Sequence, residues 1–143
     1  MTCLFCDIAA GSVPAEIVAA EEHAIAFLDH RPVFEGHTLV IPRAHLETLP
    51  DVPAPLLVPV FDLVQRLCVA MTEVLAADGT WVSENNIVSQ SVPHLHIHVV
   101  PRRRKDGLRG FYWPRNKYAS DEACAAMGAR LREALIPPRR HET

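Results

Sequence analysis

The strongest pattern in the chain is an alternation of histidines with apolar residues over residues 94–100. Side chains on a strand alternate between its two faces, so this segment is predicted to be a strand with three imidazoles on one face. The imidazoles belong to His94, His96 and His98, and the opposite face carries Leu95, Ile97 and Val99. Ordinary packing does not require three neighbouring imidazoles, so they are expected to bind or attack something.

The remaining apolar periodicity predicts further strands and three helices. We expect a short helix over 6–10, strands over 17–21, 24–29, 38–42 and 80–85, a long helix over 57–75 and a C-terminal helix that Ser120 caps. Strands with segregated helices predict an α+β fold with an antiparallel sheet.

Two helical stripes predict the core. The long helix carries Leu57, Val60, Phe61, Val64, Leu67, Cys68, Met71, Val74 and Leu75 on one side, and the C-terminal helix carries Cys124, Met127, Leu131 and Leu135. Cys68 and Cys124 are therefore expected to be core residues.

Length and charge narrow the class of protein. A chain of 143 residues is expected to form one domain, with residues 136–143 as a disordered tail. The net charge of -3 argues against a nucleic-acid partner. Seven of the 14 basic residues follow the histidine segment directly, which favours an anionic small molecule. There is neither an uninterrupted apolar run of about 18 residues nor a signal pattern, so we expect no membrane span and a cytoplasmic location.

The pair Cys3-x-x-Cys6 has the spacing of two zinc ligands. A structural zinc site needs two more ligands, and His45 and His94 are the candidates. The alternative is an incidental pair of thiols, because two cysteines alone complete no site. Disulfides are not expected in a reducing compartment.

The histidine segment itself allows two functional interpretations. The three imidazoles could jointly hold a catalytic metal, or one neutral imidazole could attack an electrophile. The polar link before them offers Asn85, Asn86, Gln90 and Ser91 for holding phosphate or ribose oxygens. A plain polar turn explains that link equally well.

These residues together resemble the histidine triad (HIT) family of nucleotide hydrolases and transferases. The segment from Gln90 to Arg102 is similar to the family signature Gln-x-Val-x-His-φ-His-φ-His-φ-φ, where φ is apolar. Cys3 to Ile8 resembles the N-terminus of many bacterial members. Ala26 to Asp29 and Gly36 to His45 resemble the stretch that holds the family's nucleotide pocket. The resemblance covers roughly residues 3–102.

The resemblance implies a five-stranded antiparallel sheet, a homodimer and a purine nucleotide or nucleotide-conjugate substrate. His96 would attack the α-phosphorus and form a nucleotidyl-histidine that water then cleaves. His98 would bind a phosphate oxygen or assist the leaving group. Asp29 would bind the ribose, and Gln90 and Ser91 the phosphate or the leaving group. The resemblance also implies a structural zinc on Cys3, Cys6, His45 and His94.

Two departures from the family pattern affect these expectations. Ser89 stands where many members have glycine, and Asn85 and Asn86 lie nearer Gln90 than usual, so either asparagine could face the phosphate. The uridylyl-transferase and phosphorylase branches of the family usually have glutamine at the position of His98. The histidine at this position therefore favours hydrolysis over transfer. Two competing interpretations are a nucleotide-binding protein without catalysis and a histidine-ligated metalloenzyme.

Overall fold

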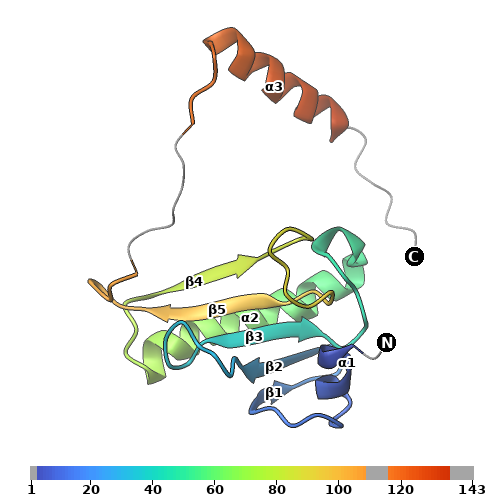
Figure 1. The fold of residues 1–143 in the computed structure, drawn as a ribbon, viewed down its shortest axis with the longest axis vertical. Helices are drawn as coiled ribbons and strands as arrows, with labels where there is room; N and C mark the ends of the chain where they lie inside the picture. Colours follow the sequence, from blue (N-terminus) through green and yellow to red (C-terminus); the bar gives the residue numbers. More distant parts are fainter. Residues whose placement is uncertain (1–2, 109–115, 136–143) are drawn as a thin grey trace. The chain divides into compact units, whose positions relative to one another are not determined.

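The computed structural model describes residues 3–108 and 116–135 (Figure 1). The chain divides into two compact units, Met1–Asp106 and Gly107–Thr143. The predicted disordered tail at 136–143 lies outside the described residues, and the assignment of the whole chain to one domain stays a prediction.

Five antiparallel strands form the sheet of the first unit, in the order β1-β2-β3-β5-β4 (Figure 1). They are β1 (Ile17–Ala20), β2 (Ala24–Leu28), β3 (Thr38–Pro42), β4 (Gly79–Glu84) and β5 (Ile97–Arg102). The helices are α1 (Leu4–Ala9), the short 3-10 helix η1 (Leu49–Asp51), α2 (Ala54–Val74) and α3 (Asp121–Ala134). The predicted α+β fold, with its long helix and C-terminal helix, is confirmed.

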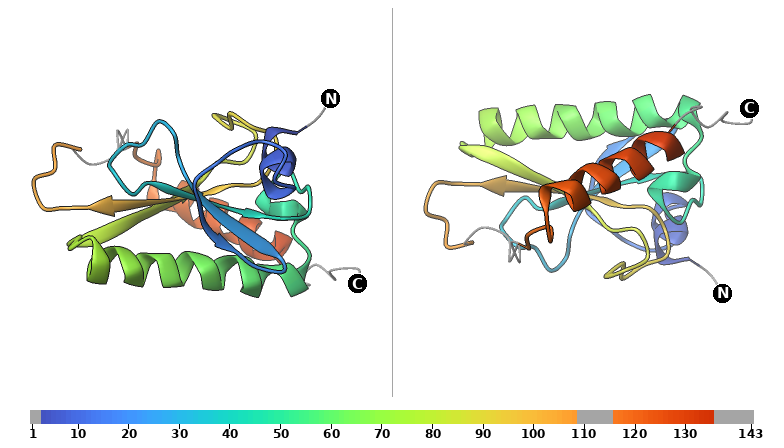
Figure 2. Two further views of the ribbon diagram at one scale, coloured as in Figure 1. Left: turned by 90° about the horizontal axis from the view of Figure 1, so that it is seen from below. Right: turned by 90° about the horizontal axis from the view of Figure 1, so that it is seen from above.

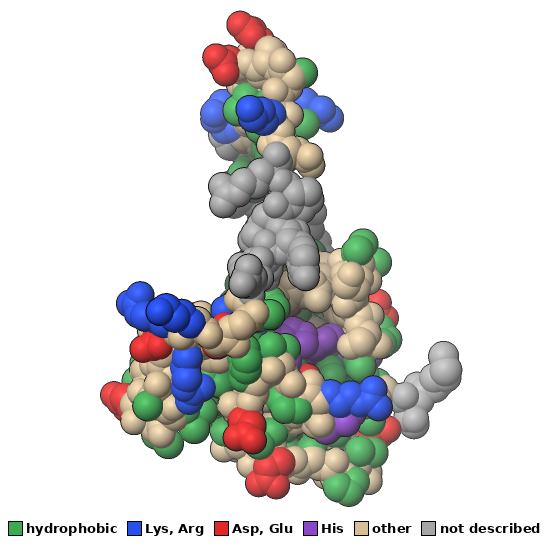
Figure 3. All heavy atoms as spheres, turned by 60° about the vertical axis from the view of Figure 1, so that its left-hand side comes forward, with side chains coloured by type: hydrophobic (Ala, Val, Ile, Leu, Met, Phe, Trp, Pro, Cys, Tyr) green, Lys and Arg blue, Asp and Glu red, His purple; other side chains and the backbone are tan. Residues whose placement is uncertain are grey.

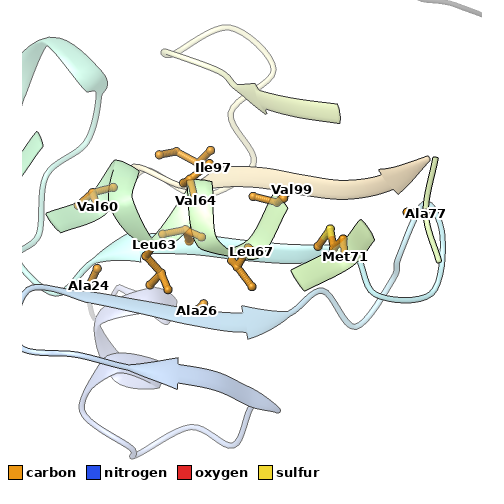
Figure 4. Packing of buried hydrophobic residues seen from close by; sticks show 11 residues of the cluster. Ala24, Ala26, Val60, Leu63, Val64, Leu67, Met71, Ala77, Ile97 and Val99 are labelled. Atoms are coloured by element: carbon orange, nitrogen blue, oxygen red, sulfur yellow. The ribbon is translucent and has the colours of Figure 1, made fainter. Parts of the chain in front are cut away.

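Helix α2 covers one face of the sheet, and α1 lies on the opposite face (Figure 2). Strands β2 and β3 are therefore buried on both faces, which explains why they read as continuous apolar runs. Towards α2 they present Ala24, Ala26 and Val40, and towards α1 they present Ile25, Phe27, Leu39 and Ile41. Figure 4 shows the α2 side of this core, which Ile97 and Val99 of β5 complete.

The buried face of α2 follows the predicted helical spacing, with four corrections. Val60, Leu63, Val64, Leu67 and Met71 are buried. The predicted stripe omits Leu63. Phe61 is 40% exposed because it lies about 100° around the helix from Val60. Val74 is 78% exposed because it is the last residue of the helix, and Leu75, which follows the helix, is 38% exposed.

Helix α2 is also the one described helix that is long and apolar enough to cross a membrane, with 21 residues and a mean hydropathy of 1.6. The run is interrupted by charged residues, among them Asp62 and Arg66, which lie on the exposed side. Its buried side packs on the sheet, as expected of a core helix.

Strand β5 begins later than predicted, at Ile97 instead of residue 94. Its hydrogen-bonded ladder with β3 starts at the pair Ile97 and Val40. The ladder does not extend towards residue 94, because Pro42 at the end of β3 has no N–H to donate. The Leu95 N–H donates instead to the Leu46 carbonyl at 2.6 Å. The predicted alternation still holds, since Leu95, Ile97 and Val99 are all fully buried.

The second unit contains α3 among its described residues. The Ser120 hydroxyl accepts a hydrogen bond from the Ala123 N–H at 3.1 Å, which confirms the predicted N-cap. The predicted buried stripe is wrong: no residue of α3 is buried, and Cys124 is exposed. The described part of this unit offers no second helix or strand against which the stripe could pack.

Candidate functional site

Four sulfur- and nitrogen-bearing side chains from three parts of the chain meet beside α1. We name Cys3, Cys6, His45 and His94 the Cys/His cluster; their ligand atoms all lie within 4.8 Å of one another. The Sγ atom of Cys3 lies 3.4 Å from Nδ1 of His94. The Sγ atom of Cys6 lies 3.3 Å from Nδ1 of His45 and 3.5 Å from Nδ1 of His94.

These distances fit a tetrahedral zinc ion. Zinc binds thiolate sulfur at about 2.3 Å and imidazole nitrogen at about 2.0–2.1 Å, which separates the two atoms by about 3.6 Å at the tetrahedral angle. The three sulfur–nitrogen distances of the Cys/His cluster are close to that value. Two thiolates with two imidazoles make a closed structural donor set, so the cluster predicted from the sequence could bind this metal.

The protonation of the Cys/His cluster also suits a metal. The His94 Nε2 atom donates to the Pro42 carbonyl at 2.9 Å, so the Nδ1 lone pair faces the cysteines. Burial lowers the pKa of His94 and favours the neutral ring that can coordinate. Burial and the adjacent Cys3 thiol raise the pKa of Cys6, so metal binding must release a proton there.

His96 is oriented by the same segment. Its Nδ1 atom lies 2.7 Å from the His94 carbonyl, which can only accept, so Nδ1 carries the proton. When the ring carries a single proton, that proton is therefore on Nδ1, and Nε2 bears the lone pair. The ring is only 3% exposed and packs edge-on against Phe5, with centroids 5.2 Å apart.

His98 is paired with a histidine to which the sequence assigned no role. The His37 Nε2 atom lies 2.9 Å from Nδ1 of His98, and the Val33 N–H donates to His37 Nδ1 at 3.1 Å. Because a backbone N–H only donates, the proton of neutral His37 lies on Nε2, and His37 donates to His98. The proton of neutral His98 must then lie on its own Nε2 atom.

Burial keeps both of these rings neutral. It lowers the pKa of His98 to about 4, with further lowering from His96 and His37. Burial also lowers the pKa of His37, although Asp29, 3.7 Å away, opposes this shift. Near neutral pH the pair is therefore two neutral imidazoles with a fixed hydrogen-bond direction.

A pocket of about 620 Å³ opens beside His96 and His98. Its apolar walls include Phe5 and Ile8 of α1 and Phe27 and Leu39 of the sheet, and its polar groups include Asp29 and Ser91. The volume falls within the range of small-molecule sites. In Figure 3, histidine side chains (purple) reach the surface of this unit among hydrophobic side chains (green).

The other polar residues predicted to bind substrate hold the loop together. Gln90 Oε1 accepts from the Ile87 N–H at 2.8 Å, and its Nε2 donates to the Glu47 carbonyl at 2.6 Å. Asn86 Oδ1 accepts from the Leu49 N–H at 2.8 Å, and Asn85 donates weakly to the Ser89 carbonyl at 3.5 Å. The structure thus brings Asp29 and Ser91 to the pocket, whereas Asn85, Asn86 and Gln90 do not line it.

The three triad histidines do not converge on one metal. Two groups of described residues could each hold an ion: the Cys/His cluster, with His94, and a group of Asp29, His37 and His98. His96 belongs to neither group, so a metal bound jointly by all three triad histidines finds no support in the described part of the chain.

Sequence reasoning missed Phe5 and His37 as site residues. The signal for Phe5 is its place between Cys3 and Cys6, which brings it to the site if the cysteines bind metal. The signal for His37 is weaker, because its contact with His98 depends on the register of β3 against β5, in which Leu39 pairs with His98.

Comparisons with known proteins agree with this geometry. The family model described as the HIT domain matches residues 10–105. The chain is 30% identical over 133 residues to the adenosine 5'-monophosphoramidase hnt1 of Schizosaccharomyces pombe, covering 92% of this chain and 96% of that protein. Several other relatives are described only as uncharacterised HIT-like proteins.

Two solved structures are similar over nearly the whole chain. A HIT-family protein from Bacillus subtilis is 32% identical with a TM-score of 0.86, covering 95% of this chain and 99% of that one. A zinc-bound histidine triad protein from Mycobacterium smegmatis is 36% identical with a TM-score of 0.72, covering 94% and 98%. The chain belongs to the HIT-domain (histidine triad) family.

Proposed function

We propose that this protein is a nucleotide hydrolase that cleaves a nucleoside phosphoramidate, adenylate or dinucleoside polyphosphate at the α-phosphorus. The observation that carries the proposal is the orientation of His96: the hydrogen bond from Nδ1 to the His94 carbonyl leaves the Nε2 lone pair free beside the pocket. A neutral, oriented imidazole is an effective nucleophile towards phosphorus.

The remaining residues of the pocket have complementary roles in this proposal. Asp29 accepts hydrogen bonds from the ribose hydroxyls, and the apolar walls around Phe27 enclose the base. His96 Nε2 attacks the α-phosphorus as the bond to the leaving group breaks. His98 donates its Nε2 proton to a phosphate or leaving-group oxygen or nitrogen, and Ser91 adds a hydroxyl at the same end. Water then cleaves the phosphorus–nitrogen bond to His96, releasing the nucleotide.

The proposed zinc has a structural role only. Cys3, Cys6, His45 and His94 would hold it and so fix α1 against the segment before β5. When bound, zinc supplies a rigid tetrahedral crosslink between these parts of the chain. The Mycobacterium smegmatis relative, described as zinc-bound, supports this assignment.

The substrate class rests on relatives and on His98. The Schizosaccharomyces pombe relative is named an adenosine 5'-monophosphoramidase, which favours an adenosine phosphoramidate among the possible substrates. A histidine at position 98, where transferase branches of the family have glutamine, favours hydrolysis over transfer. A role in binding nucleotides without turnover is the competing proposal.

We also propose a cytoplasmic homodimer that binds neither nucleic acid nor membranes. Strand β4 is the last strand in the order of the described sheet, and Val82 on it is 41% exposed. The outer side of α2 adds Val58, Phe61 and Val69, which are 75%, 40% and 50% exposed. Light scattering should give the mass of two chains, and a monomer at micromolar concentration would contradict the dimer.

The proposal is tested by the turnover of purified wild-type protein and the His96→Ala variant. Adenosine and guanosine phosphoramidates are compared with dinucleoside polyphosphates, and zinc content is measured on the same samples. We expect turnover of at least one substrate, lost by about 10³-fold or more in His96→Ala with zinc retained. Undiminished turnover by that variant would rule out the mechanism.

A further inference from the structure

Helix α1 serves two sites at once. The residues at its start, Cys3 and Cys6, belong to the Cys/His cluster. Leu4, Phe5 and Ile8, from the same six-residue segment, line the pocket beside His96. The metal ligands and the pocket wall therefore share one short element.

This helix is too short to be stable alone. Isolated helices shorter than about 12 residues are marginal in water. The N-cap residue Cys3 makes no side-chain capping hydrogen bond, and the first turn carries one acidic residue, Asp7. Its order must therefore come from tertiary contacts. These are the Cys/His cluster, the packing of Phe5 and Ile8 on the sheet, and the hydrogen bond from Arg43 Nη1 to the Ala9 carbonyl at 3.0 Å.

Phe5 contacts both sites directly. Its ring centroid lies 6.0 Å from that of His94, a member of the Cys/His cluster, and 5.2 Å from that of His96, both edge-on. It also packs on Phe27 in the pocket wall at 5.4 Å. A second connection runs through the backbone, since the His94 carbonyl holds His96.

We propose that Phe5 is a positioning residue that couples the two sites, so that zinc in the Cys/His cluster and a nucleotide in the pocket bind cooperatively. The inference rests on the proposed function in one respect, that the pocket accepts a nucleotide. Ordering α1 costs conformational entropy. The ligand that binds first pays this cost, and the second ligand then binds to an already ordered helix. By linkage, AMP must tighten zinc binding by the same factor as zinc tightens AMP binding.

The coupling is measured as two pairs of affinities. Zinc affinity is determined by competition with a chelator, with and without saturating AMP, and AMP affinity by calorimetry on the zinc-loaded and zinc-free protein. We expect both pairs to differ by the same factor, at least about 5-fold. If AMP binds but leaves the zinc affinity unchanged, the coupling is wrong while the proposed function stands. If neither AMP nor GMP binds the zinc-loaded protein, both are wrong.

The Phe5→Leu variant distinguishes a coupling role of Phe5 between the two sites from a purely structural role. It keeps every member of the Cys/His cluster, so we expect full zinc content, a raised KM with a smaller change in kcat, and a coupling factor reduced towards one. Phe34→Leu, the same change at a residue outside both the Cys/His cluster and the pocket lining, should retain the wild-type factor. A Phe5→Leu protein with the wild-type coupling factor would overturn the role of Phe5, and the wild-type measurement tests the coupling even if this variant does not fold.

Discussion

The Nε2 atom of His37 donates to the Nδ1 atom of His98 across strands β3 and β5, at 2.9 Å. The direction of this hydrogen bond follows from the backbone, because the Val33 N–H occupies the other nitrogen of His37. His98 consequently presents an N–H group, and His96 presents a lone pair. Two neighbouring imidazoles, with centroids 5.1 Å apart, are thus prepared for opposite roles.

Replacing His37 should impair chemistry more than binding. In His37→Asn the donor to His98 is lost, and His98 can adopt the tautomer without an Nε2 proton. We expect kcat to fall by about 10- to 100-fold with little change in KM, since loss of one oriented donor typically costs about that much or more. Steady-state kinetics check this, with His23→Asn, a histidine outside the pocket, as the control. A wild-type kcat would show that His37 does not orient His98.

The lowered pKa of His98 predicts a loss of stability in acid. Its folded pKa of about 4 lies below the usual value of 6.5, so between these values the unfolded chain binds a proton that the native protein does not. The free energy of unfolding should therefore fall as the pH drops from 6.5 to 4. In urea titrations over this range, His98→Asn should show a shallower fall than the wild type. Equal slopes would contradict the assignment of a neutral, buried His98.

Removing zinc should loosen the N-terminus. A chelator, or the change Cys6→Ser, removes the proposed crosslink between α1 and the segment before β5, and ligands that bind only the folded state stabilise it. We expect a fall in Tm of several degrees and faster hydrogen exchange in residues 4–9. Cys124→Ser changes an exposed cysteine in the other unit and should leave both unchanged. A Tm that is independent of zinc would argue against a bound metal.

The loop before the histidines carries backbone strain that can be relieved. Ile87 has φ +69°, a left-handed conformation that a β-branched residue rarely adopts, and its side chain is 78% exposed. Ile87→Gly should therefore raise the free energy of unfolding by about 1 kcal/mol. The adjacent Val88→Gly, equally exposed but without positive φ, should lower it. Destabilisation by both changes would mean that Ile87 is not strained.

Much of the fold could be predicted because buried faces of strands and helices require apolar residues at regular spacings in the sequence. The alternation over residues 94–100 predicted the buried apolar face of Leu95, Ile97 and Val99, but His94, His96 and Val100 are buried as well. Strand β5 starts later than predicted because Pro42 interrupts the ladder with β3. The stripe of α3 has the same kind of periodicity but no partner element in the described part of its unit. Periodicity therefore reports which residues could share a face, whereas their burial depends on what packs there.

The site was less predictable, because polar side chains can bond to the chain or to a ligand. Gln90 and Asn86 are residue types that often bind phosphate. In the structure, however, their side-chain amides form hydrogen bonds to the backbone of Glu47 and Leu49. The members of the Cys/His cluster could be predicted from the sequence, because a zinc site that contains Cys3 and Cys6 needs two more ligands. The partnership of His37 with His98 required the strand register, which no local pattern reveals.

The most direct test of the mechanism is to trap its intermediate. Wild-type protein is mixed with an adenosine phosphoramidate, quenched within milliseconds in alkali, under which phosphorus–nitrogen bonds of histidine survive, and digested for mass spectrometry. We expect one AMP group attached to His96, formed and lost at rates compatible with turnover, and absent from His96→Ala. Turnover without any adduct on His96 would contradict the mechanism.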